Sequence, residues 1–147
     1  MKAKFVTKDF IVVTLITSLW VHASQLARFF PYVKPKLAAF LPTVPNLAPM
    51  DNLGILFSWG LWDMLLAALY VGVFWLVAQV NGNTNKSVLI SALMSWCFFF
   101  VLYWVGTANM NLAPWSMLLV ILPLALLETV VASFMASRLY ARRSSQA

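Results

Sequence analysis

The chain has 147 residues, of which 63% are hydrophobic and only 10% are charged, whereas a typical soluble domain has about 25% charged residues. This length allows one domain, and the apolar composition excludes an ordinary soluble globular protein. The net charge is +6, but the basic residues lie at the ends of apolar segments and do not form one cluster, so we expect no nucleic-acid partner.

Four long apolar segments fill most of the chain, approximately over residues 10–30, 53–80, 87–106 and 115–140. Each contains the ~20 apolar residues that a helix needs to cross a ~30 Å hydrocarbon core. In lipid the backbone must satisfy its own hydrogen bonds, and runs of this length without alternation indicate helices. The sequence therefore predicts an all-α integral membrane protein in contact with the lipid bilayer. Residues 1–147 would form a single polytopic domain, a bundle of four transmembrane helices.

The first segment carries a polar stripe. Thr14, Ser18, His22 and Gln25 are spaced so that they share one face of a helix. Because a polar stripe facing lipid is costly, we expect it to face other helices or a wet cavity.

An alternative interpretation of the N-terminus is a signal peptide. Lys2, Lys4 and Lys8 precede an apolar run, and small residues follow it, so that cleavage would fall after Ala23. The mature chain would then have three spans. Against this, the apolar character continues beyond Ala23 to Phe30.

Residues 31–52 hold five of the seven prolines. This spacing predicts no long regular helix, yet the residues between the prolines are too apolar for a solvated linker. We expect a Pro-rich interfacial loop between helices 1 and 2, with one short helical turn near Lys36–Leu41. Such a loop could be a simple connector resting on lipid, a cap over a cavity or a docking surface. The prolines are Pro31, Pro35, Pro42, Pro45 and Pro49.

The second segment contains Asp63 on one face with Trp59, Ala67 and Tyr70, and Trp62 lies beside that face. Packing is the simpler explanation of these aromatic residues. The alternative is an aromatic-walled pocket, formed by Trp59, Trp62 and Tyr70, that holds an organic cation or an apolar ligand.

The third and fourth segments carry small residues at helical spacing. Ser87, Ser91 and Ser95 form one such face, which predicts close helix approach. The fourth segment has a similar face of small residues, formed by Ala125, Thr129, Ser133 and Ser137. The single cysteine, Cys97, excludes an intramolecular disulfide and is expected to be a packing residue.

Three ionisable residues lie at comparable depth. At ~1.5 Å per residue, His22 is ~12 Å, Asp63 ~15 Å and Glu128 ~20 Å from the outer ends of their segments. Ionisable groups inside a membrane are costly, and they indicate either function or hydrogen bonds that lock the bundle. The candidate polar intramembrane site therefore consists of His22, Asp63, Glu128, Ser18 and Gln25. We assign no metal and no cofactor, because no ligand spacing or catalytic motif is present.

Counting Lys and Arg on each side predicts the orientation. Seven basic residues would lie on the inner side and three on the outer side, which favours two cytoplasmic termini. In a bacterium the protein would then lie in the inner membrane. The inner residues are Lys2, Lys4, Lys8, Lys86, Arg138, Arg142 and Arg143, and the outer ones are Arg28, Lys34 and Lys36.

Three functions remain open. The favoured one is a non-catalytic subunit or accessory protein of a membrane complex, with a protein partner or a second copy of itself. The second is a small oligomeric transporter or ion-coupled carrier that uses Asp63 and Glu128. The third is an intramembrane enzyme or binding protein for an apolar ligand. Four short spans leave little room for an alternating-access cavity in one protomer, which favours the first. A cavity lined by both carboxylates would favour the others.

Overall fold

The computed structural model describes residues 6–44 and 52–144, and within them every regular element is helical. Four helices are long and apolar enough to span a membrane: Thr7–Phe40, Leu53–Asn81, Asn85–Asn109 and Trp115–Arg143. The all-helical prediction is thereby confirmed. The four helices indicate a multi-pass membrane protein.

The first span is longer than the sequence pattern predicts. It consists of α1 (Thr7–Arg28), a π-helical turn η1 (Phe29–Val33) and α2 (Lys34–Phe40). The prediction of a loop from Pro31 is therefore wrong for residues 31–40, although the helical turn expected near Lys36–Leu41 is present as α2. Pro45 and Pro49 lie outside the described residues, so the interfacial position of the connection stays a prediction.

The π-turn explains how the helix passes Pro31. Proline has no N–H, and its ring crowds the carbonyl of the preceding turn. In η1 the backbone is wider, and the Lys34 N–H bonds to the Phe29 carbonyl five residues earlier. Pro35 lies at the start of α2, among the positions where proline is best tolerated.

The second and third spans begin with side-chain caps. The Asn52 side chain accepts hydrogen bonds from the N–H groups of Gly54 and Ile55 at the start of α3 (Leu53–Asn81). Thr84 caps α4 (Asn85–Trp96) in the same way. The turn between them places Gly82 at φ 73°, a left-handed conformation that favours glycine. A second π-turn, η2 (Cys97–Val101), joins α4 to α5 (Leu102–Asn109).

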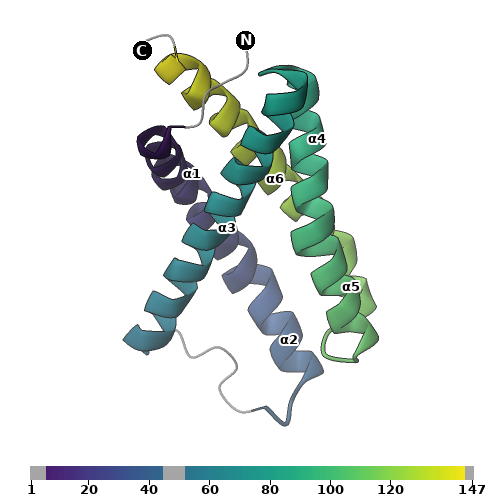
Figure 1. The fold of residues 1–147 in the computed structure, drawn as a ribbon. Coiled ribbons are helices and arrows are strands. Elements are labelled where there is room, and N and C mark those ends of the chain that lie inside the picture. Colours follow the sequence, from purple (N-terminus) through teal and green to yellow (C-terminus); the bar gives the residue numbers. More distant parts are fainter. Residues whose placement is uncertain (1–5, 45–51, 145–147) are drawn as a thin grey trace.

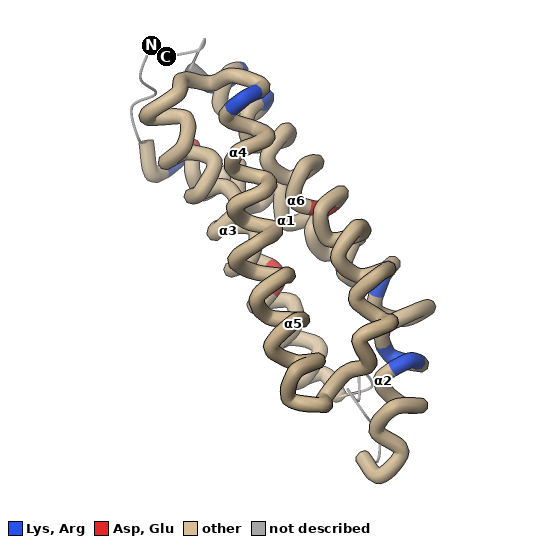
Figure 2. Tube along the Cα trace, turned by 90° about the vertical axis from the view of Figure 1, so that its right-hand side faces the viewer, with Lys and Arg blue, Asp and Glu red and all other residues tan. Residues whose placement is uncertain are grey.

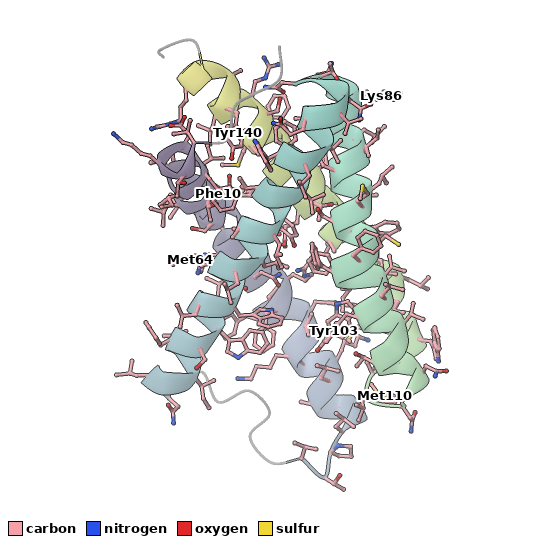
Figure 3. The ribbon with its side chains drawn as sticks, in the orientation of Figure 1. Phe10, Met64, Lys86, Tyr103, Met110 and Tyr140 are labelled. Carbon is pink, nitrogen blue, oxygen red and sulfur yellow. The ribbon has the colours of Figure 1, made fainter. Side chains whose placement is uncertain are left out.

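The last helix, α6 (Trp115–Ser144), packs against α1, α3 and α4. Figure 1 shows α3 crossing α1, with α4 and α5 alongside α6. The start of α1, the end of α6 and the α3–α4 turn lie at one end of the bundle, where Phe10 and Tyr140 also lie (Figures 1 and 3). At that end Phe74 stacks on Tyr140, with 6.3 Å between the ring centroids.

The small-residue face of α4 is fully buried, as predicted. Ser87, Ser91 and Ser95 have no exposed surface, and the facing helix α6 buries Thr129 and Ser133 equally well. Small side chains on both sides allow the two backbones to approach closely. Cys97, by contrast, is exposed on the surface of the bundle, which does not agree with the expectation of a packing residue.

Candidate functional site

Glu128 is the centre of a polar cluster inside the bundle. It lies on α6 and has no exposed surface. Its carboxylate accepts hydrogen bonds from Arg28 Nη2 at 3.1 Å and Ser24 Oγ at 2.7 Å. The Tyr70 hydroxyl donates at 3.0 Å and Gln25 Nε2 at 3.4 Å. Both carboxylate oxygens are therefore occupied by donors from the first two spans.

The first span supplies three of these donors because of their spacing. Ser24, Gln25 and Arg28 occupy positions i, i+1 and i+4, which lie on one side of a helix. Gln25 also accepts a hydrogen bond from Arg28 Nη2 through its Oε1, at 2.8 Å. Nη2 thus bridges Gln25 and Glu128. The Gln25 amide therefore holds the Arg28 guanidinium in position beside the Glu128 carboxylate.

Arg28 is itself buried, with 5% of its surface exposed, and forms an ion pair with Glu128. Its guanidinium lies over the Phe100 ring of η2, 5.0 Å from the centroid. This contact offers the cation the electron-rich face of an aromatic ring. Nη1 has no hydrogen-bond partner among the described residues. With Tyr70 of the second span bonded to Glu128, the pair is in contact with residues of all four spans.

Two tryptophans attach neighbouring helices to the backbone of α6. Trp20 Nε1 donates to the Glu128 carbonyl at 3.1 Å, and Trp96 Nε1 donates to the Leu122 carbonyl at 2.8 Å. A buried indole N–H needs a partner. These bonds fix α6 relative to α1 and α4 on either side of the cluster.

Asp63 lies beside this cluster but outside its hydrogen-bonded set. It is 7% exposed and lines a recess of about 50 Å³ between α1 and α3. Gln25 lines the same recess and also donates to Glu128, so it lies near both carboxylates. The charged or ionisable groups near enough to act on Asp63 include His22 and Arg28. The remaining lining residues are Leu26, Phe29 and Trp59.

His22 and Ser18 make hydrogen bonds within their own helix. His22 Nδ1 is 2.7 Å from the Ser18 carbonyl, and Ser18 Oγ donates to the Leu15 carbonyl at 2.8 Å. A carbonyl only accepts, so Nδ1 carries the proton and Nε2 of a neutral ring is left as an acceptor. Nε2 lies toward Gly60 of α3, where an added Cβ would be 3.8 Å away.

The three candidate pocket aromatics lie in different surroundings. Tyr70 is fully buried and bonds to Glu128. Trp59 is 44% exposed at the rim of the Asp63 recess, and its ring centroid is 6.3 Å from that of Phe29. Trp62 is 59% exposed and does not line that recess.

The structure thus brings Gln25 and Glu128 together and places Asp63 next to them. Arg28 and Ser24 belong to the cluster but were not among the predicted site residues. Arg28 was instead counted with the outer basic residues. The sequence feature that could have identified Arg28 is its position inside the apolar segment 10–30, because a cation within a membrane span requires a counter-charge. Within the described ranges, no group of three or more His, Cys, Asp or Glu side chains could hold a metal ion.

The fold and this enclosed ion pair define the class of protein: a helical chain of four candidate membrane spans with a polar interior. Comparison with known protein families, with curated proteins and with solved structures finds no match.

Proposed function

We propose that this protein is a non-catalytic subunit or accessory protein of a membrane complex. The supporting observation is the condition of Glu128, which is fully buried and accepts hydrogen bonds from four side chains. A transported ion or a substrate must reach the group that binds it. A carboxylate enclosed by donors from two other spans is suited instead to holding those spans in one arrangement.

A second candidate is a small oligomeric ion-coupled carrier, and the surroundings of Asp63 favour it. This carboxylate is buried, lines a recess and is not used by the Glu128 cluster. With Arg28 and Glu128 neutralising each other, Asp63 is the charge in this region that a proton or small cation could balance. Gln25 connects the recess to the ion pair.

Purification from native membranes distinguishes the two functions. We expect the tagged chain, extracted in mild detergent, to co-elute with one partner protein at fixed stoichiometry. We also expect the isolated chain in liposomes to carry no proton or sodium flux above that of empty vesicles. Flux by the isolated chain that Asp63→Asn abolishes would establish the carrier and contradict the accessory role.

We further propose that both termini are cytoplasmic and, in a bacterium, that the protein lies in the inner membrane. In Figure 2 one group of basic positions lies at the end of the bundle where α4 begins, and the others lie along the opposite half, on the side of α2. Because Arg28 is buried against Glu128, only Lys34 and Lys36 remain of the three outer residues. This strengthens the asymmetry on which the proposal depends.

Cysteine labelling tests this orientation in a Cys97→Ser background. A membrane-impermeant maleimide is expected to label Thr43→Cys in intact cells, and to label Asn85→Cys only after the cells are opened. Both positions are exposed at opposite ends of the described bundle. Labelling of Asn85→Cys from outside would reverse the orientation, and a mature N-terminus at Ser24 would establish the signal peptide.

A further inference from the structure

A groove runs along the bundle between α1 and the last turns of α6. Its volume is about 260 Å³, and its lining residues are Ile16, Phe134, Met135, Arg138, Leu139 and Arg142. Arg142 is eight positions after Phe134, so the α6 side of the groove extends ~12 Å along the helix axis. The two arginines lie toward the C-terminal end, and the deeper part is apolar.

The arginines present their charge in a form suited to phosphate. Arg138 stacks on the Phe134 ring, with its guanidinium carbon 4.9 Å from the centroid. Stacking occupies the face of a guanidinium and leaves the N–H groups directed outward in its plane. Arg142 lies one helical turn further on the same side, and both side chains are exposed. The adjacent Arg143 forms an ion pair with Asp9.

The electrostatic surroundings favour an anion. Among the described residues, this end of the bundle has five cations and one carboxylate, Asp9. The cations are Lys8, Lys86, Arg138, Arg142 and Arg143. Below the arginines, Ile16 and Phe134 are partly exposed apolar side chains. The groove therefore has positive charge at the level of a membrane interface and apolar walls beneath it.

We propose that this groove binds one anionic phospholipid. The phosphate would lie between Arg138 and Arg142, and the first part of an acyl chain would lie along Ile16, Phe134 and Met135. The groove is smaller than the ~300–1,000 Å³ of pockets that enclose a drug-sized molecule, but a lipid needs only partial enclosure because the bilayer covers the rest. The groove has its charge at one end and apolar walls beyond it, just as a phospholipid has a charged headgroup followed by acyl chains.

Native mass spectrometry of the delipidated protein tests the site by titration with phosphatidylglycerol or phosphatidylcholine. We expect tighter binding of phosphatidylglycerol, and roughly 30-fold weaker binding of it by the double variant Arg138→Gln/Arg142→Gln. The charge-matched control is Lys8→Gln/Lys86→Gln, whose positions do not line the groove. It should retain the affinity of the wild type. Melting temperatures in phosphatidylcholine verify that both variants are folded.

Several outcomes would overturn the proposal. Equal binding of the two lipids would show that the arginines do not recognise the headgroup. Equal losses in the two double variants would show a diffuse charge effect without a site. Displacement of the lipid by inorganic phosphate at the same concentration would show a small-anion site. A dimer that the arginine variant dissociates, with unchanged lipid preference, would show that the groove is an interface between copies.

Discussion

Replacing Glu128 by Leu is expected to lower the free energy of unfolding by about 3–5 kcal/mol, because the buried Arg28 guanidinium would lose its counter-charge. Ser24 and Tyr70 would lose an acceptor at the same time. Arg28→Met is expected to cost a similar amount, since it leaves the carboxylate unpaired. Unfolding in detergent micelles, followed by circular dichroism, measures both changes.

The double variant Arg28→Met/Glu128→Leu is the decisive comparison. Removing both charges leaves no unpaired ion, so its loss of stability should be well below the sum of the single losses. Additive losses would show that the two residues contribute independently and that the ion pair does not organise the cluster. Lys36→Met, a change at an exposed cation of α2, serves as a control and should have little effect.

Replacing Ser91 by Leu is expected to destabilise the bundle by about 1–3 kcal/mol or to disrupt its assembly, because overpacking forces apart closely packed surfaces. Ser91 has no exposed surface, and its hydroxyl donates to the Ser87 carbonyl of its own helix at 2.7 Å. The added methyl groups would press against α6.

The matched control for this change is Leu93→Phe on the same helix. Leu93 is 42% exposed and points away from the packed face, so a larger side chain there should leave the melting temperature nearly unchanged. If Ser91→Leu is tolerated as well as Leu93→Phe, then α4 and α6 are not held closely at this level.

The sequence pattern predicted the spans well where a segment is uniformly apolar and ends at turn residues. The third and fourth segments and the buried serine face are examples. It failed at Pro31, because proline usually marks the end of a helix. The sequence does not reveal that a π-turn lets the helix continue although Pro31 has no N–H. That choice depends on how α2 packs against its neighbours. Val33 and Leu37 belong to a cluster with Met117 and Ile121 of α6.

The membership of the polar cluster was only partly predictable. Depth estimates place residues at a level in the membrane, but the rotation of each helix about its axis decides which side chains meet. Arg28 therefore pairs with Glu128, whereas His22 and Ser18 are satisfied by carbonyls of their own helix. Polar residues with local acceptors need no partner on another span, so the stripe alone does not identify the site.

The distance in sequence between Arg28 and Glu128 has a consequence for biogenesis. The two residues are 100 positions apart, so at ordinary translation rates Arg28 is synthesised about 5–20 s before its counter-charge. During that interval the first span carries a cation without its final partner. Asp63 arrives with the second span, much earlier than Glu128, and lies near Arg28 in the finished bundle. Of the two carboxylates that lie near Arg28 in the bundle, Asp63 is therefore synthesised first and can neutralise Arg28 before the fourth span completes the pair.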